Sequence, residues 1–562
     1  MSTDHTRPGL LWEVAVRLCL LSDTHVGAAQ AVPRHAAESD VDLHVDRDPR
    51  TGVPRLRATT LAGLLRHELA ERTGDPCRVR ELFGAAESRS APGPGPDGPL
   101  TSALDVDDAA AELPEDTTLA VRVGTRVDPA GGTVRPGRLW QWEVLPAGTV
   151  FTAHLRLRVP SPADEARLLT LLVLAAGGLA GEGPGIRVGG RTGRGYGAVR
   201  ATHWAVERHD LTDEHAWFAY HARTWSERWE RGADALGDAP ADLSTALDVR
   251  LRAEGRAATA AHVAARADLC DHRRRAELHL TLAVAEQPAP AVPSARGPRP
   301  EDDRRRASAP PADPSSREPR PGLLMVGDVP APERLGAVDR AHRHRPVVSD
   351  PDKASVRLAP VLGDTALFAL FKRIAGRLAR DAAEHLGAEE PRWRGWHAHW
   401  WGADTDPGTA VPHPSRVRLR SAPHLRGGAP LTTTRLTVDA LFGDAVDGRL
   451  FTTDLHCGGS GEVVLDVREP DDAVLGLLAL VVRELATVPF DTLGAGAGSG
   501  NGRLTATRAA LTTHAGDGGP PHRVDLLTAL FDPAGGEAAT ARGWVSALRA
   551  RLAPEGGAGE GP

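Results

Sequence analysis

Alternating apolar and polar residues predict strands in the first third of the chain. The run at 11–20, LWEVAVRLCL, alternates well enough to be a strand. Apolar residues recur at helical spacing in 61–71, and a second helix is expected over 163–180. Further strands are expected at 118–123, 139–145 and 150–158. Strands on both sides of lone helices predict an α+β fold with a ferredoxin-like (RRM-like) sheet.

The middle of the chain has a different composition. Residues 211–275 look largely helical and are expected to join two halves of the protein. Residues 286–321 are rich in Pro, Ala, Ser and charge, so they cannot bury a core and are predicted to be a disordered insert. The glycine-rich tail after Ala553 is expected to be loose.

An internal repeat is the most informative feature of the pattern. The first half carries, in this order, a strand, Val41-Asp42, a helix, Ser102, Thr125-Arg126, Gly137-Arg138-Leu139-Trp140, a helix and the loop Gly189 to Gly197. The second half carries a strand, Val338-Asp339, a helix, Ser415, Thr434-Arg435, Gly448-Arg449-Leu450-Phe451, a helix and the loop Gly494 to Gly502. Arg126 precedes Gly137 by 11 residues, and Arg435 precedes Gly448 by 13. The shared order predicts two related domains.

Composition narrows the class of protein. A chain of 562 residues with a net charge of −7 is long enough for several domains and is not a globally basic nucleic-acid binder, so any RNA site must be a local patch. The four cysteines form no CxxC pair, which argues against a disulfide framework and a four-ligand zinc site. We see no secretory signal and no apolar run long enough to span a membrane, and therefore expect a soluble cytoplasmic protein.

Several of these segments resemble motifs of the RAMP superfamily, the ferredoxin-like proteins of CRISPR systems. The resembling segments are VDLHVDRDPRTGVPRLRATTLAGLLRHEL, Leu82-Phe83-Gly84, Ser102 to Ala109, GGRTGRGYG at 189–197, PSRVRLRSA at 414–422 and LGAGAGSGNGR at 493–503. The resemblance implies a first RAMP domain at 9–205, a helical linker at 206–275, a second RAMP domain at 276–552 and a tail at 553–562. The helix start at 57–63, RATTLAG, departs from the family pattern by lacking its lysine.

The loop at 189–197 has the chemistry of a phosphate contact. Its glycines, among them Gly193, Gly195 and Gly197, let the backbone approach a phosphate, and arginine binds phosphate through two parallel hydrogen bonds. We therefore expect Arg191 and Arg194 to bind RNA and Tyr196 to stack on a base or sugar. The alternative is a tight turn with incidental arginines. Arg126, Arg435 and Arg503 are expected to bind RNA in the same groove, and Arg416 is a further predicted RNA contact.

An acidic segment precedes the first predicted helix. Asp40, Asp42, Asp46 and Asp48 crowd together, and the run from Asp48 to Gly52 is turn chemistry. The RAMP resemblance aligns Asp42 with the family's RNA-cleaving aspartate, and Asp339 occupies the equivalent place in the second half. The resemblance implies that both are catalytic and that Asp42 holds Mg²⁺, whose other ligands would be RNA and water oxygens. A merely solvated acidic loop is the alternative.

The stretch at 392–401, RWRGWHAHWW, interleaves aromatic and basic residues. Such a pattern suits splayed single-stranded bases, but a hydrophobic segment packed on its own domain or on a neighbouring subunit is the favoured interpretation.

The resemblance implies a backbone subunit of a type III CRISPR effector. Its expected partners are guide RNA, target RNA and other effector subunits, with Mg²⁺-dependent endoribonuclease activity as a further expectation. One alternative is a catalytically inactive scaffold or cap subunit. Another is a guide-RNA-processing endoribonuclease that uses His35 or His44 as its base.

Overall fold

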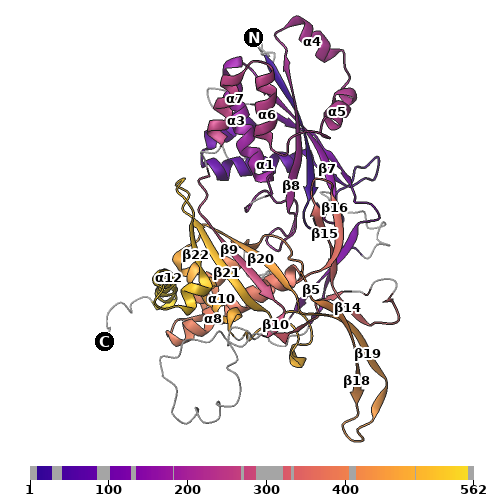
Figure 1. The fold of residues 1–562 in the computed structure, drawn as a ribbon, viewed down its shortest axis with the longest axis vertical. Helices are drawn as coiled ribbons and strands as arrows, with labels where there is room; N and C mark the ends of the chain where they lie inside the picture. Colours follow the sequence, from indigo (N-terminus) through magenta and orange to yellow (C-terminus); the bar gives the residue numbers. More distant parts are fainter. Residues whose placement is uncertain are drawn as a thin grey trace, which may run out of the picture. The chain divides into compact units, whose positions relative to one another are not determined.

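The computed structural model describes residues 9–27, 41–84, 101–127, 134–181, 183–267, 271–286, 320–328, 330, 334–403, 413–487 and 489–554 (Figure 1). The predicted disordered insert lies outside these residues, except for the short paired strands β10 (Ala285–Glu286) and β11 (Arg320–Pro321) at its ends. Residues 555–562 of the predicted tail also lie outside them, as do Asp40, His35 and the side chains of Arg126 and Arg138.

The chain forms two compact units. The first contains Met1–Arg273, Pro346–Leu358 and Ala515–Pro520, and the second contains Arg274–Arg345, Ala359–His514 and Pro521–Pro562. Both combine helices with mainly antiparallel sheets, so the predicted α+β class is confirmed.

The first unit is built on an antiparallel sheet with ferredoxin-like strand order. Strand β1 (Leu10–Leu20) lies between β7 (Val150–Val159) and β8 (Val199–Asp210), and β3 (Leu104–Val106) pairs with the outer side of β7. The order β8-β1-β7-β3 is that of a split βαβ fold, because helices connect β1 to β3 and β7 to β8. The edge carries two short strands, β2 (Arg55–Leu56) and β4 (Ala109–Glu112).

Helices cover one face of this sheet and bury its apolar side chains. Trp12, Val14, Val16 and Leu18 of β1 belong to the same core as α1 (Ala58–Thr73), α2 (Pro76–Phe83) and α3 (Glu165–Ala176). The alternate residues of β1 face the other way, as the period of two requires. Helix α1 ends at Thr73. The next residue, Gly74, adopts a left-handed conformation and donates its N–H to Ala70 O.

The segment expected to be a joint contributes four helices, α4 (Glu214–His221), α5 (Trp225–Asp234), α6 (Leu243–Ala253) and α7 (Ala257–Ala267). Helices α6 and α7 pack onto the first unit, since Leu247 and Val263 are buried in its core. Helices α4 and α5 bury no side chain completely. Asp213 caps α4, and a reciprocal capping box of Thr224 and Glu227 starts α5.

The second unit has a sheet of the same strand order, built from residues far along the chain. Strand β9 (Arg275–Ala283) lies between β20 (Ser460–Arg468) and β21 (Thr505–His514), and β17 (Val417–Leu419) flanks β20. Strand β22 (His522–Asp525) extends the other edge. Helices α8 (Thr365–His385), α10 (Asp472–Ala486), α11 (Leu526–Phe531) and α12 (Gly536–Leu552) supply its core.

The tryptophan-rich stretch forms helix α9 (Glu390–Trp401) in the second unit. Trp396, Trp400 and Trp401 are buried in the same core as α8. The favoured interpretation, a hydrophobic segment packed on its own domain, is therefore confirmed.

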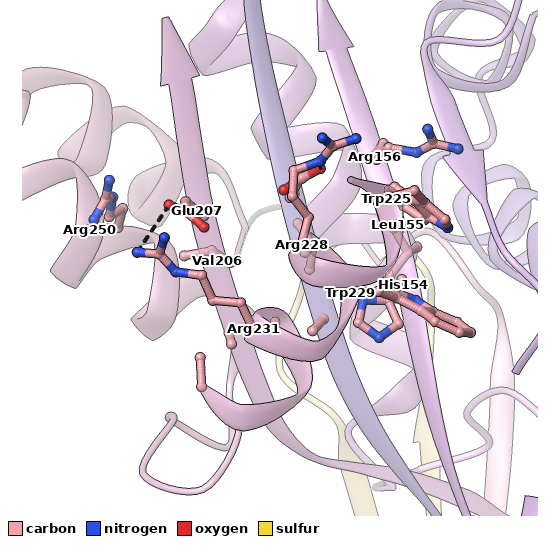
Figure 2. A pocket seen from close by; sticks show the side chains of 16 residues that line it. His154, Leu155, Arg156, Val206, Glu207, Trp225, Arg228, Trp229, Arg231 and Arg250 are labelled. Atoms are coloured by element: carbon pink, nitrogen blue, oxygen red, sulfur yellow. Dashed lines mark hydrogen bonds and ion pairs between the residues drawn. The ribbon is translucent and has the colours of Figure 1, made fainter. Parts of the chain in front are cut away.

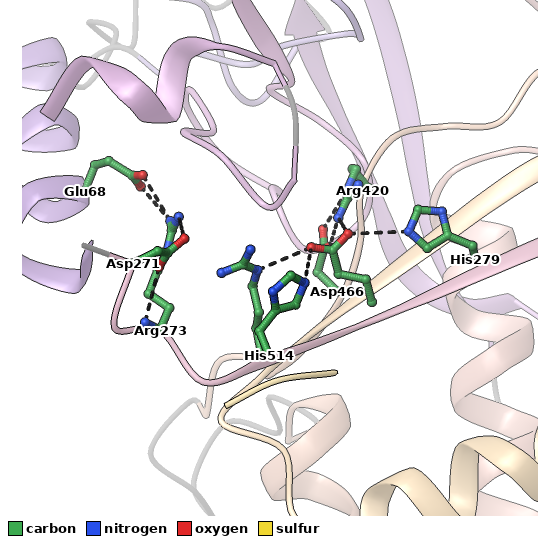
Figure 3. Close-up of polar contacts among 9 residues, drawn as sticks. Glu68, Asp271, Arg273, His279, Arg420, Asp466 and His514 are labelled. Atoms are coloured by element: carbon green, nitrogen blue, oxygen red, sulfur yellow. Dashed lines mark hydrogen bonds and ion pairs between the residues drawn. The ribbon is translucent and has the colours of Figure 1, made fainter. Parts of the chain in front are cut away.

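Two buried carboxylates of the second sheet, Glu277 and Asp466, share one arginine. Arg420 donates to Glu277 (Nη2–Oε2, 2.7 Å) and to Asp466 (Nε–Oδ2, 3.2 Å), and His279 and His514 also pair with Glu277 (Figure 3). Although burial raises the pKa of Glu277, hydrogen bonds from His279 and Arg420 hold it well below its ordinary value. Arg420, which follows β17, thus links β9 to β20 through their carboxylates.

Two long hairpins complete the units. The first hairpin is β5 (Ala120–Val127) with β6 (Val134–Val144), and the second is β18 (Ala429–Val438) with β19 (Ala445–Cys457). Short strands pair around the second hairpin, namely β12 (Leu323–Leu324), β13 (Gly327–Asp328) and β14 (Arg340–His342). A separate pair consists of β15 (His344–Asp350) and β16 (Ser355–Pro360). Single-turn helices are η2 (Pro162–Asp164), η3 (Gly177–Leu179) and η6 (Ala497–Ser499).

Candidate nucleic-acid interface

The glycine-rich loop of the first unit, Gly189 to Gly197, is docked backbone to backbone. Gly190 N–H donates to His25 O at 2.9 Å, and Gly197 N–H donates to Asp23 O at 3.0 Å. A Cβ on Gly189 would lie 2.1 Å from His25 O, and one on Gly197 would lie 2.1 Å from Val188 O. Glycine is therefore required at both ends of the loop, because any side chain would collide with main-chain atoms.

The two loop arginines lie differently. The Arg191 guanidinium stands over the Trp142 ring, with Cζ 3.7 Å from the ring centroid, so a tryptophan of the first hairpin orients it. The Arg194 side chain is half-buried, and among the described residues it has no hydrogen-bond or ion-pair partner. Arg194 is therefore the cation in this loop that is most available to a phosphate.

Tyr196 does not present its ring to solvent. It is only 2% exposed and packs with Trp142 and Val144, its ring centroid 6.4 Å from that of Trp142. The expectation that Tyr196 stacks on RNA is corrected by this burial: the ring holds the loop against the first hairpin. Gly193, Gly195 and Gly197 lie along the same loop, the last two with positive φ.

Asp42 is exposed and lies beside the first hairpin. Its N–H donates to Gln141 O at 3.0 Å, and its Oδ2 accepts the Gln141 N–H at 2.7 Å. Among the described residues, Oδ1 of Asp42 has no partner. One carboxylate oxygen is thus fixed by the backbone while the other remains available for a ligand.

The neighbouring acidic residues have structural contacts. Asp46 is buried, and hydrogen bonds from Arg57 and Arg55 hold its pKa below the ordinary value. Asp48 accepts from the N–H groups of the next turn, which confirms the predicted turn chemistry. His44 lies 3.4 Å from Glu143 as a half-buried pair.

The loop geometry recurs in the second unit. Ala495 N–H donates to Met325 O at 2.8 Å, and Gly502 N–H donates to Leu323 O at 2.7 Å. A Cβ on Gly494 would lie 2.2 Å from Met325 O, and one on Gly502 would lie 2.0 Å from Leu493 O. The second glycine loop, Gly494 to Gly502, is therefore anchored by the same backbone contacts as the first.

Asp339 repeats the geometry of Asp42. It is exposed, its N–H donates to Thr452 O at 2.9 Å, and its Oδ2 accepts the Thr452 N–H at 2.7 Å. Thr452 and Gln141 each follow a Gly-Arg-Leu-aromatic run in the returning strand of a hairpin. Among the described residues, Oδ1 of Asp339 also has no partner.

The hairpin register corrects the alignment of the hairpin arginines. Trp140 lies opposite Gly124, whereas Phe451, after the same triplet, lies opposite Arg435. Arg435 therefore takes the place of Gly124 and not of Arg126, which accounts for the unequal spacing to the following Gly-Arg-Leu run. A Cβ on Gly124 would lie 2.5 Å from the Trp140 ring, so glycine makes room for that ring.

The structure brings some predicted RNA contacts together and leaves others apart. Arg435 Nη1 donates to Ser499 Oγ at 3.1 Å, which joins the second hairpin to the second glycine loop. Arg503 is exposed directly after that loop. Arg416 instead pairs with Glu469 (Nη1–Oε2, 2.7 Å) just before β17, and within the described part of the chain its side chain has no hydrogen bond or ion pair with the loop.

Neither Asp42 nor Asp339 belongs to a cluster of possible metal ligands among the described residues. Within the described part of the chain, one group of three His, Asp or Glu side chains has ligand atoms within 4.8 Å of one another: Glu13, Glu207 and His209, on the sheet. Asp42 is not in such a group, so Mg²⁺ there would take one protein oxygen and its remaining ligands from RNA and water.

These observations define an α+β domain of ferredoxin-like order with an arginine-bearing glycine loop packed on a hairpin. Residues 17–200, which contain Asp42, the first hairpin and the first glycine loop, match the model of the RAMP superfamily. Over this segment the chain is therefore similar to proteins of the RAMP superfamily. No curated protein matches the chain.

No helix in the described residues is long and apolar enough to cross a membrane.

Sequence reasoning missed the residues that hold the loop in place. Trp142 orients Arg191 and covers Tyr196, and Asp23 forms an ion pair with Arg122 (2.6 Å) next to the loop. The sequence could have indicated Trp142, because it lies two residues after Trp140 of the Gly-Arg-Leu-Trp run and so on the same face of the strand. The Asp23–Arg122 pair joins residues distant in sequence, and nothing in the local pattern indicated it.

Proposed function

We propose that this protein is an RNA-binding backbone subunit of a type III CRISPR effector that holds guide RNA and recognises target RNA. The observation that carries the proposal is the recurrence, in both units, of an aspartate bonded to a hairpin backbone beside a backbone-anchored glycine loop. We infer that the second unit is a diverged copy of the first, so one chain presents two equivalent binding positions.

Local cations would hold the RNA backbone despite the net charge of −7. In the first unit, Arg194 is available and Arg191 is pre-oriented on Trp142. In the second unit, Arg435 and Arg503 border the glycine loop. Sequence selectivity would come from pairing between guide and target, while the protein grips backbone and shape.

RNA affinity as a function of salt tests the binding role. The double variant Arg191→Ala/Arg194→Ala is expected to lower the affinity for guide RNA and to flatten the slope of log affinity against log salt by about 0.7 per lost phosphate contact. Arg47→Ala, which removes an exposed arginine of the same unit outside the loop, is the matched control. Unchanged affinity and slope in the double variant would show that the loop is only a turn.

We further propose that Asp42, and Asp339 at a second position, support cleavage of the paired target RNA. In each residue the backbone fixes Oδ2, which leaves Oδ1 to bind Mg²⁺ together with RNA and water oxygens. When bound, Mg²⁺ would stabilise charge at the scissile phosphate. Two such aspartates would give two cuts at a fixed interval.

Cleavage by the chain assembled with guide RNA tests this step. Asp42→Asn keeps an oxygen that can accept the Gln141 N–H but removes the charge, and it should abolish one specific product while target affinity is retained. Asp48→Asn removes the same charge from a turn residue of the same segment and should leave all products unchanged. Identical products from Asp42→Asn and wild type, or no cleavage by wild type, would make the chain a binding scaffold only.

A further inference from the structure

The face of the first unit's sheet that α1, α2 and α3 do not cover carries two adjoining cavities. Helix α5 and strands β1, β7 and β8 enclose a cavity of about 210 Å³, shown in Figure 2. Helix α4 and the neighbouring ends of β1 and β7 border a second cavity of about 440 Å³. Arg156 of β7 lines both, so the two form one outer groove.

Aromatic side chains from helices α4 and α5 line the outer groove. Trp225 and Trp229 lie in the smaller cavity with their ring centroids 6.4 Å apart, and Trp229 packs on His154. Trp217 and Tyr220 line the larger cavity, where the ring of Trp217 lies 4.3 Å from that of His221. Neither helix buries a residue completely, so these rings are held at the surface and not in the core.

Arginines lie between the aromatic rings. Arg156 is held over Trp225 with Cζ 4.3 Å from the ring centroid, an arrangement visible in Figure 2. Its nearest carboxylate oxygen, on Asp107, is 3.6 Å away. Arg158 uses Nη2 to reach Ser102 O and Asp105, both at 3.0 Å. The Nε atoms of both arginines are buried and have no hydrogen-bond acceptor among the described residues.

We propose that the outer groove is a second RNA-binding site, which takes a short single-stranded segment. A base would stack on Trp217, and phosphates would pair with Arg158 and with Arg156, which Trp225 orients. Stacking rings interleaved with arginines suit splayed bases, because every base has a π-face and every linkage has a charge. The larger cavity falls within the size range of sites for small ligands, about 300–1,000 Å³, which is sufficient for one nucleotide.

The chemistry of the groove argues for a single strand and against duplex RNA. Bases in a duplex are stacked on one another and offer no free face to an indole ring. The groove residues lie on the sheet face and on α4 and α5, whereas the glycine loop lies beyond the end of β1. The inference therefore does not rest on the glycine loop or on Asp42.

Binding of labelled oligouridylate to the full chain tests the inference. Trp217→Ala and Arg158→Ala are made in a chain that already carries Arg191→Ala/Arg194→Ala, so that loop binding is removed first. Trp217→Ala should weaken binding about 5- to 150-fold, the range that loss of one stacked base produces. Arg158→Ala should flatten the salt dependence by about 0.7.

A matched control comes from the same segment. Arg223→Ala removes a charge between α4 and α5, and Arg223 does not line the groove. This variant should bind as the parent does, and circular dichroism should show the same fold in every variant. Ultraviolet crosslinking should attach oligouridylate to the segment at 211–231, and a blunt RNA duplex should neither crosslink there nor compete.

The outcomes separate this site from the glycine loop. If the loop variant retains no single-strand binding, or if Trp217→Ala and Arg158→Ala bind like their control, the groove inference is overturned while loop binding stands. If the loop variant binds like wild type and the groove variants do not bind, the groove is supported and the loop is not the RNA contact.

Discussion

Replacing Gly189 with alanine tests how the first glycine loop is held. Gly189 has φ +81°, and a Cβ there would lie 2.1 Å from His25 O and 2.8 Å from His25 C. A left-handed conformation costs a residue with a side chain about 1–2 kcal/mol. Forcing extra atoms into a packed contact costs typically about 1–3 kcal/mol more, because here the obstacle is backbone. We therefore expect the docked loop to lose about 2–5 kcal/mol.

Amide hydrogen exchange measures this loss locally, which is appropriate because a chain of two units has no single unfolding free energy. The Gly190 and Gly197 amides, bonded to His25 O and Asp23 O, should exchange faster by roughly one and a half to three and a half powers of ten. RNA affinity should fall with them, because Arg191 and Arg194 lie in the same loop.

Gly52→Ala is the matched control for backbone conformation. Gly52 has φ +73°, and a Cβ there would have nothing within 4 Å. Gly52→Ala should therefore lose only the free energy of the left-handed conformation, and only in its own turn. The exchange rate of the Gly190 amide should not change. Equal effects of the two substitutions on their local amides would refute the reasoning, since the collision with His25 O would then contribute nothing.

Two further predictions concern the second unit. Arg420→Met leaves Glu277 and Asp466 buried without their shared cation and should destabilise the second unit by about 3–5 kcal/mol, measured by amide hydrogen exchange in β9 and β20. Wild-type exchange rates in those strands would contradict the ion-pair account. Burial lowers the pKa of His342 to about 3, and its Nδ1 accepts the Val326 N–H, so the folded state requires a neutral ring. Its stabilising contribution is complete above the unfolded pKa of about 6.5 and falls with decreasing pH, by about 2 kcal/mol at about pH 5. His342→Leu should flatten that pH dependence, and an equally steep dependence in the variant would exclude His342 as its source.

Periodicity in the sequence was enough to locate the main elements. Alternation at 11–20 corresponds to β1, and the helical spacing at 61–71 lies within α1. Both assignments succeed because one face of each element is buried, so the position of apolar residues reports the local geometry directly. The pairing of Asp42 with Asp339 also came from sequence order, and their matching backbone contacts agree with it.

Tertiary structure decided which side chains remain available in these elements. Tyr196 looked like a stacking residue in sequence, but Trp142, more than fifty positions earlier, covers its ring. Arg435 was matched with Arg126 by order along the chain, and only strand register placed it opposite Phe451. A pairing register that changes by even one residue reverses the face of every side chain, and sequence spacing does not reveal it when hairpin lengths differ.

The outer groove shows the same division between sequence and structure. The sequence of helices α4 and α5 is visibly rich in aromatic residues, and their exposure in the structure shows that these rings are not core. What brings Trp217 and Trp225 to one surface with Arg156 and Arg158 is the packing of both helices against β1, β7 and β8. Such contacts join residues about sixty to two hundred positions apart, and their energy depends on distances that no local pattern encodes.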